Sequence, residues 1–202
     1  MNRALTRVVS WGHELLAEVV GLGDLVVDLT AGNGRDSLVL YELVGDSGQV
    51  VAFDIQNEAL DKTRTLLEAQ GARVRLSSES ETRLDRQAGI DLVAASHEFL
   101  DRHVTYAPLG IIANLGYLPG GDQAIITRLE STLSALGQAA DMLAVKGRMA
   151  IVAYPGHSGG DEEAIAVTEF FLRLPEDKFQ VLQIKVCNRP LAPILFVAEK
   201  AV

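Results

Sequence analysis

The segment from Asp28 to Asp36 has the composition of a ligand-binding loop. Gly32 and Gly34 stand where the chain is expected to turn from a buried strand into a helix over residues 33–44. Glycine lets the backbone turn sharply and approach a ligand closely. The free N–H groups and the positive dipole at the start of a helix suit a carboxylate or a phosphate. The loop therefore predicts a binding site for a small molecule that carries an anionic group.

The polar residues around this loop favour one class of cofactor over another. A second predicted strand ends at Asp54, twenty residues past Gly34, where a carboxylate can accept both hydroxyls of a ribose. A dinucleotide site prefers a third glycine where this chain has Ser37, and an apolar strand end where it has Asp28 and Thr30. A carboxylate at position 28 can hold an ammonium group. S-adenosylmethionine has an ammonium group, a carboxylate and a ribose but no phosphate, so the pattern favours it over NAD.

A second group of residues, after the predicted strand 109–114, has the types needed to bind an amine and a planar base. Ligands bind beyond the carboxyl ends of strands in a doubly wound sheet, and Asn114 lies at such an end. Its amide oxygen can accept a hydrogen bond from an amine and orient the nitrogen lone pair toward an electrophilic methyl group. Tyr117 offers a flat face for a base, and Pro119 with the two glycines after it shapes the loop.

The elements that must position these residues alternate between short apolar runs and amphipathic helices, which predicts an α/β fold with a doubly wound, mostly parallel sheet. Seven strands are expected, at 25–29, 50–54, 90–95, 109–114, 148–154, 181–186 and 194–199. Helices are expected at 4–20, 33–44, 57–69, 124–144 and 161–174. Asp161 is the expected N-cap of the last helix, and Gly147 is expected to end the one before it. We expect a single domain over 1–202, with 1–20 as a lead helix.

The segment 71–88 admits two interpretations. Residues 73–77 can form the third strand of the sheet. Alternatively, 71–88 is an insertion and 90–95 is the third strand. Because 71–88 is highly charged, as surface excursions are, we favour the insertion and hence seven strands.

Composition limits the kinds of partner and site that the protein can have. The 202 residues include 18 basic and 27 acidic side chains, for a net charge of −9, which argues against a general nucleic-acid or membrane surface but allows a local basic site. Arg102, His103 and Arg128 flank the predicted site and are candidates for it. Cys187, the single cysteine, excludes an internal disulfide and is expected in the core. We expect no metal site, no membrane span and a cytoplasmic protein.

Longer motifs give the chain a family resemblance. They are Asp28-x-Thr30-x-Gly32-Asn33-Gly34-x-Asp36, Phe53-Asp54-Ile55-Gln56, Ser96-His97-Glu98, Asn114-Leu115-Gly116-Tyr117-Leu118-Pro119-Gly120-Gly121-Asp122 and Tyr154-x-Gly156-His157-x-Gly159-Gly160. On these motifs the chain resembles the YtqB-like, or rRNA methylase, family of class I methyltransferases over nearly its whole length. The nonapeptide from Asn114 is highly specific, whereas the glycine loop alone is not. The segment 71–88 departs from the compact members of the family.

The resemblance implies a Rossmann-like fold, S-adenosylmethionine as cofactor and transfer of a methyl group to RNA. The substrate it favours is the aminomethyl group of 5-aminomethyl-2-thiouridine at the tRNA wobble position, so the anticodon region of tRNA is the implied partner. Cofactor contacts are expected at Asp28, Thr30, Gly32, Asn33, Gly34, Asp36, Asp54, Gln56, Ser96, His97, Asn114 and Leu115. Substrate contacts are expected at Tyr117, Leu118, Pro119, Gly120, Gly121, Asp122, Tyr154 and His157. Asn114, Tyr117 and Asp122 are the expected catalytic residues.

Other functions remain open on the sequence alone. The acidic charge suits a methyltransferase for a small-molecule or protein amine, and rRNA is an alternative RNA substrate. A sensor that binds the cofactor without turnover is a further possibility, while Ser37 and Asp28 disfavour an NAD-dependent oxidoreductase. The sequence leaves open whether a homodimer forms.

Overall fold

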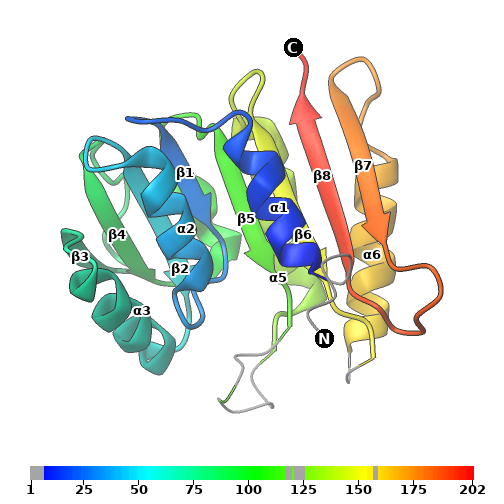
Figure 1. Cartoon of the computed structure of the whole chain (residues 1–202), viewed down its shortest axis with the longest axis horizontal. Helices are drawn as coiled ribbons and strands as arrows, with labels where there is room; N and C mark the ends of the chain where they lie inside the picture. Colours follow the sequence, from blue (N-terminus) through cyan, green and yellow to red (C-terminus); the bar gives the residue numbers. More distant parts are fainter. Residues whose placement is uncertain (1–6, 117–119, 121–125, 157–158) are drawn as a thin grey trace.

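An eight-stranded sheet forms the centre of the computed structural model, which describes residues 7–116, 120, 126–156 and 159–202. The strand order is β3-β4-β2-β1-β5-β6-β8-β7, and strands β1 to β6 run parallel while β8 is antiparallel to both of its neighbours (Figure 1). The strands are β1 (Leu25–Asp28), β2 (Gln49–Asp54), β3 (Val74–Ser78), β4 (Gly89–Ala94), β5 (Gly110–Asn114), β6 (Arg148–Ala153), β7 (Phe179–Lys185) and β8 (Ile194–Lys200). The predicted doubly wound, mostly parallel sheet is confirmed, with eight strands in place of seven.

Helices cover both faces of this sheet (Figure 1). They are α1 (Val8–Ala17), α2 (Arg35–Val44), α3 (Asn57–Ala69), α4 (Leu100–His103), α5 (Leu129–Met142), α6 (Gly160–Leu172) and the 3-10 turn η2 (His97–Phe99). Neighbouring residues of β1 point to opposite faces, so Val26 joins the core under α1, α2 and α3, whereas Val27 joins the core under α4, α5 and α6. Burial on both faces explains why this strand reads as a continuous apolar run. Within the described ranges, no helix has the length and apolar character to cross a membrane.

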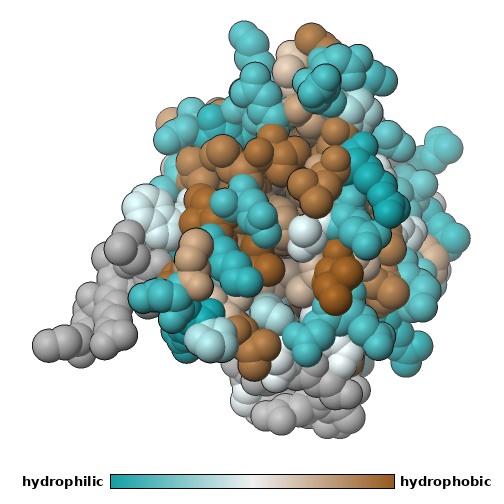
Figure 2. All heavy atoms as spheres, turned by 90° about the vertical axis from the view of Figure 1, so that its right-hand side faces the viewer, coloured by the Kyte–Doolittle hydropathy of each residue, from teal (hydrophilic) through white to brown (hydrophobic). Residues whose placement is uncertain are grey.

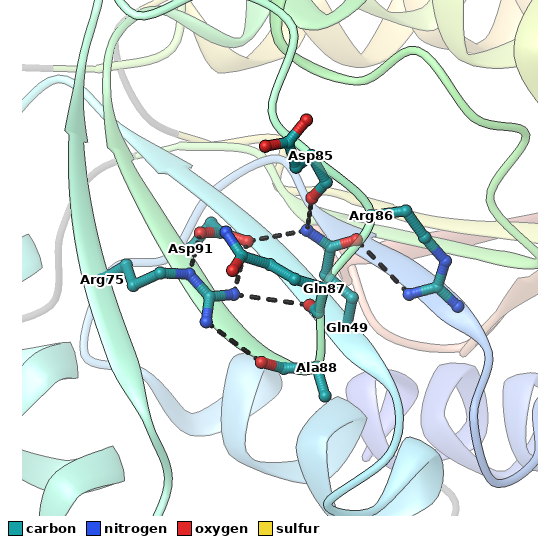
Figure 3. Close-up of polar contacts among 7 residues, drawn as sticks. All are labelled: Gln49, Arg75, Asp85, Arg86, Gln87, Ala88 and Asp91. Atoms are coloured by element: carbon teal, nitrogen blue, oxygen red, sulfur yellow. Dashed lines mark hydrogen bonds and ion pairs between the residues drawn. The ribbon is translucent and has the colours of Figure 1, made fainter.

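The segment 74–78 is a strand, so the interpretation of 71–88 as an insertion outside the sheet is wrong at this point. β3 pairs in parallel with β4 from Val74 opposite Ile90 to Ser78 opposite Ala94. Of the charged residues in 71–88, Arg75 lies in the strand and is compensated within the sheet by an ion pair with Asp91 at 2.6 Å (Figure 3), whereas 79–88 is a largely exposed connection. A charged residue can therefore stand in this edge strand.

Several expected helix ends differ from the structure. The lead helix covers 8–17 rather than 4–20, and residues 1–6 lie outside the described part of the chain. α5 begins at Leu129, where 124 was expected, and Gly147 lies beyond the helix in a turn in which its N–H donates to Ala144 O. The N-cap of α6 is Gly159, with φ 78°, whereas the Asp161 carboxylate accepts a hydrogen bond from Gly156 N. The expectation that Asp161 is the N-cap is therefore wrong, because its carboxylate binds the loop before the helix while Gly159 takes the left-handed conformation at the N-cap.

The last strand pair forms the other edge of the sheet. β7 is the edge strand, and Figure 2 shows hydrophobic residues gathered among hydrophilic ones on this side of the molecule. Leu182 of β7 is 56% exposed. Cys187 lies just after β7 and is exposed, so the expectation that it belongs to the core is wrong. The strand expected at 181–186 covers Phe179–Lys185, so Cys187 lies in the connection that turns back into β8.

Candidate active site

A cavity of about 970 Å³ lies at the carboxyl ends of the parallel strands. These ends point downward in Figure 1. Its lining comes from the segments that follow β1, β2, β4, β5 and β6. The helix α1 adds Val9 and His13 to the wall. Segments far apart in the sequence thus meet where a doubly wound sheet places its ligands.

The glycine loop after β1 is held by α3 and by Asp54. Gly34 has φ 78°, and a Cβ atom at this position would lie 2.9 Å from Thr63 Cα, so the loop packs too closely on α3 for any side chain. Gly32 N donates to Asp54 Oδ2 at 2.9 Å, and Gln56 N donates to Asp54 Oδ1 at 2.9 Å. Burial raises the pKa of the Asp54 carboxyl. A carboxylate offers about four acceptor positions, so Asp54 can shape the loop and still accept ribose hydroxyls.

Asp28 lies beneath this loop rather than in the cavity wall. Its carboxylate is fully buried and accepts hydrogen bonds from Ser37 Oγ at 2.6 Å and from Thr30 N at 3.0 Å. Burial, followed by repulsion from Asp36, raises the pKa of Asp28 to about 7. The predicted contact between Asp28 and a cofactor ammonium group therefore gains no support from the lining, to which Asp36 and Asp54 contribute the carboxylates at this loop.

A chain of hydrogen bonds joins α1, α2, β5 and the segment after β6 across the cavity wall. His13 Nε2 lies 2.6 Å from Asp36 Oδ1, and Asn114 Nδ2 donates to Asp36 Oδ2 at 2.5 Å. Tyr154 Oη donates to Asn114 Oδ1 at 3.1 Å. Burial, with a smaller repulsion from Asp36, raises the pKa of Tyr154 to about 12, so the hydroxyl keeps its proton at neutral pH. The Asn114 backbone is fixed as well, because its N–H donates to Thr30 Oγ1 at 2.8 Å.

His97 lines the same cavity and has a ring nitrogen that can accept a hydrogen bond. Its Nδ1 lies 3.2 Å from Leu29 O, and a carbonyl can only accept, so Nδ1 carries the hydrogen. Burial lowers the pKa of His97, which keeps the ring neutral at neutral pH. The Nε2 atom is then an acceptor, and it is buried without a partner within the described residues. A buried acceptor of this kind fits a ligand that offers a hydroxyl or an amino group.

Most of the predicted site residues that the structure describes meet in this one cavity. Those in its lining are Thr30, Gly32, Asn33, Asp36, Asp54, Gln56, Ser96, His97, Asn114, Leu115 and Tyr154. Asp28, Gly34 and Gly120 are described but are not part of the lining. Tyr117, Leu118, Pro119, Gly121, Asp122 and His157 lie outside the described residues, so the structure does not test them.

The local basic site takes a different form from the one predicted. His103 is buried, and Arg102 lies with its guanidinium 4.2 Å from the centre of the Phe99 ring. Of the three predicted basic residues, Arg128 lines the cavity, and it is joined by Arg35, which sequence analysis did not select. Both arginines are exposed. The arrangement puts two cations at the cavity of an otherwise acidic protein.

Sequence reasoning also missed the contribution of α1. Val9 and His13 are one helical turn apart, a spacing that places two side chains on the same face. The apolar pattern of the lead helix accounted for its packing on the sheet but gave no signal that this face ends at a cavity. No group of three or more histidine, cysteine or acidic side chains in the described residues has the arrangement of a metal site.

Comparisons with known proteins place this geometry in context. A family model described as "Putative rRNA methylase" matches residues 50–200. The chain is 37% identical over 190 residues to the tRNA (mnm(5)s(2)U34)-methyltransferase, chloroplastic, of Arabidopsis thaliana. That alignment covers 91% of this chain and 65% of the relative, so the chain spans about two thirds of the curated relative's length.

Two solved structures share nearly the whole fold. A "putative rRNA-methylase" from Clostridium thermocellum has a TM-score of 0.85 and 34% identity, covering 96% of this chain and 97% of that one. A "putative methyltransferase" from Streptococcus mutans, solved in complex with SAH, has a TM-score of 0.82 and 31% identity, covering 96% and 98% of the two chains.

Proposed function

Since the chain belongs to the family described as "Putative rRNA methylase", we propose that it transfers a methyl group from S-adenosylmethionine to RNA. The finer proposal is that the acceptor is the aminomethyl group of 5-aminomethyl-2-thiouridine at the tRNA wobble position, in line with the name of the Arabidopsis relative. The observation that carries the proposal is that the glycine loop, Asp54 and Asn114 open into one cavity.

The residues in the cavity fit S-adenosylmethionine. The relative from Streptococcus mutans was solved with SAH, the demethylated form of this cofactor. We assign Asp54 to the ribose hydroxyls and Asp36 to the ammonium group, because both carboxylates line the cavity. His97 Nε2 supplies an acceptor for a further hydroxyl or amino group. When bound, the cofactor supplies a methyl group that its positively charged sulfur has already activated.

The protein's task in this reaction is to align and desolvate the substrate amine. Well-aligned reactants gain roughly 7–11 kcal/mol relative to reactants that diffuse freely. Asn114 Oδ1 can accept a hydrogen bond from the amine and direct its lone pair, while a dry cavity favours the neutral amine that can react. Tyr154 retains its proton at neutral pH and donates to Asn114, so it is a hydrogen-bond donor and not the base. The proton lost from the amine can pass to water.

A second candidate is a methyltransferase for a small-molecule or protein amine. The net charge of −9 favours it, because an acidic surface attracts a cationic amine and repels RNA. The exposed Arg35 and Arg128 at the cavity favour the RNA substrate instead. The anticodon region as the contact, a homodimer and a cytoplasmic location remain predictions.

A nucleoside assay separates these candidates. The protein is incubated with S-adenosylmethionine carrying a labelled methyl group and with tRNA whose wobble uridine bears the free aminomethyl group. Separate reactions contain rRNA and a pool of low-molecular-weight amines. We expect the label in one nucleoside after digestion of tRNA, with the mass of the methylaminomethyl derivative. Label in rRNA or in the amine pool would replace the proposed substrate, and binding of the cofactor without transfer to any pool would support a sensor.

A further inference from the structure

The lead helix α1 contributes one polar side chain to the cavity, and that side chain contacts Asp36. The His13 and Asp36 side chains are 19% and 14% exposed, and His13 Nε2 lies 2.6 Å from Asp36 Oδ1. An ionised carboxylate can only accept, so the histidine ring donates its Nε2 hydrogen. The distance and the burial are those of a charge-assisted hydrogen bond, which is stronger than one between neutral groups.

The second oxygen of the same carboxylate determines how the Asn114 amide is oriented. Asp36 Oδ2 accepts the hydrogen bond from Asn114 Nδ2 at 2.5 Å. Because the carboxylate has no hydrogen to offer, the amide must turn its NH₂ group toward Asp36. Its Oδ1 atom then faces the other way, where the Tyr154 hydroxyl donates to it at 3.1 Å. If the amide turned over, a donor would replace the acceptor at this point of the cavity.

We propose that His13 is a positioning residue for methyl transfer. It holds the Asp36 carboxylate, which fixes the Asn114 amide with Oδ1 available to the substrate amine. The inference rests on the proposed function, because it takes an amine to be the group that Oδ1 receives. It also gives α1 a role in the reaction beyond its packing on the sheet, since loss of one donor on this helix misaligns an atom on β5.

Three variants test this role. His13→Leu replaces the ring with an apolar side chain that has no donor. His13→Gln keeps an N–H donor that can extend to Asp36. Glu14→Gln is the matched control, because Glu14 is the next residue of α1, is exposed and is not part of the cavity lining. For each protein we would measure the thermal midpoint, the dissociation constant for S-adenosylmethionine, and kcat and KM with tRNA.

A second readout does not depend on turnover. The side-chain amide signals of Asn114 in a ¹⁵N–¹H spectrum, identified by their loss in Asn114→Asp, report the hydrogen bonds of Nδ2 directly. We expect His13→Leu to shift these signals and Glu14→Gln to leave them in place. Unshifted signals in His13→Leu would overturn the proposal, because Asp36 and Asn114 would then be fixed without the histidine.

The expected kinetic result is a loss of kcat that the conservative variant restores. His13→Leu should lower kcat about tenfold to a hundredfold with little change in KM for tRNA, the size of effect seen when a reacting group is misplaced. His13→Gln should stay within about threefold of wild type because it still donates to the carboxylate. Equal losses in both variants, or a normal kcat in His13→Leu, would overturn the proposal. If the wild-type protein methylates no tRNA, the proposed function fails, and the amide signals alone decide whether His13 positions Asn114.

Discussion

Buried carboxylates at the two ends of the parallel strands have different hydrogen-bond partners. At the amino end, Asp91 of β4 receives Arg75 Nε at 2.6 Å on one oxygen, and Arg75 Nη2 and Gln49 Nε2 on the other (Figure 3). At the carboxyl end, Asp28 and Asp54 receive their hydrogen bonds from backbone N–H groups and a serine hydroxyl. The first carboxylate is matched by a cation, and the other two are held by neutral donors.

This difference has an energetic meaning. The paired end also holds the connection before β4, because Arg75 of β3 donates to Ala88 O and Gln49 of β2 donates to Asp85 O (Figure 3). At the carboxyl end, burial raises the pKa of Asp28 and of Asp54, and each raised pKa weakens the folded state at neutral pH. Of these two carboxylates only Asp54 lines the cavity, where together with Asp36 it is suited to a ligand that carries a positive charge.

Removal of the paired carboxylate should have the largest effect on stability. Asp91→Ala removes a carboxylate that is 2% exposed from an Arg75 side chain that is 30% exposed and keeps its hydrogen bond to Ala88 O. Breaking a fully buried pair costs about 3–5 kcal/mol, and because Arg75 is partly exposed we expect about 2–4 kcal/mol, which urea unfolding followed by circular dichroism would measure. Glu58→Gln is the control, because it breaks the exposed pair with Lys62 on α3 and should cost less than about 1 kcal/mol. Equal losses in the two variants would remove the contrast between paired and surface charges.

The pair between Arg75 and Asp91 also explains why the sequence did not predict β3. Apolar runs predicted the strands that are buried on both faces, such as β1 and β2, because burial alone dictates their composition. β3 lies at the edge of the sheet, and its residues are half-exposed or exposed except for Ser77. Its charge is compensated by Asp91, a residue that follows the 71–88 segment. Pairing between distant residues is invisible to a local pattern, so the charge was interpreted as an insertion.

At the cavity, Asn114→Ala should have the largest effect on activity. The substitution removes the acceptor for the substrate amine and leaves Tyr154 and Asp36 without their amide partner. Loss of one preorganised hydrogen-bonding group typically lowers kcat by about 10²–10³. Single-turnover transfer to tRNA measures the rate, and calorimetric titration of S-adenosylmethionine should show a much smaller change in binding. Unchanged turnover would take Asn114 out of the reaction.

The sequence predicts the cavity residues that lie at the carboxyl ends of strands, and misses those that come from other elements. Residues that end a strand, such as Asp54 and Asn114, reach the cavity because parallel strands place their carboxyl ends together. Asp28 also ends a strand, but its side chain is buried beneath the loop and accepts a hydrogen bond from Ser37. The direction of this side chain is set by tertiary packing, which the local sequence does not show. His13 comes from a helix that precedes β1 and carries no motif. Its contact with Asp36 arises from how α1 lies on the sheet.

Asp28→Asn should stabilise the protein, and the gain should depend on pH. The unfolded carboxyl loses its proton near 3.8 and the folded one at about 7. Between these values the folded state holds the extra proton, so the free energy of unfolding falls as the pH rises from about 4 to about 7 and then levels off. The asparagine variant lacks this loss, and we expect it to be more stable on the order of 2 kcal/mol near pH 8 but similar to wild type near pH 4. Urea titrations at both pH values measure the difference, and a constant difference would contradict a raised pKa at Asp28.

The smallest effects are expected from Arg35 and Arg128, the exposed cations at the cavity. An exposed cation at the cavity can bind an RNA phosphate without the desolvation cost of burial. Arg75, by contrast, is partly buried in its pair with Asp91 at the amino ends of the strands. Each alanine substitution should weaken tRNA binding by about 1 kcal/mol and lower the slope of log K against log salt concentration by about 0.7–0.9. Arg64→Ala, which removes an exposed cation paired with Glu68 on α3, is the control. If all three variants change the salt slope equally, RNA contacts the surface generally, and the two arginines have no special place at the cavity.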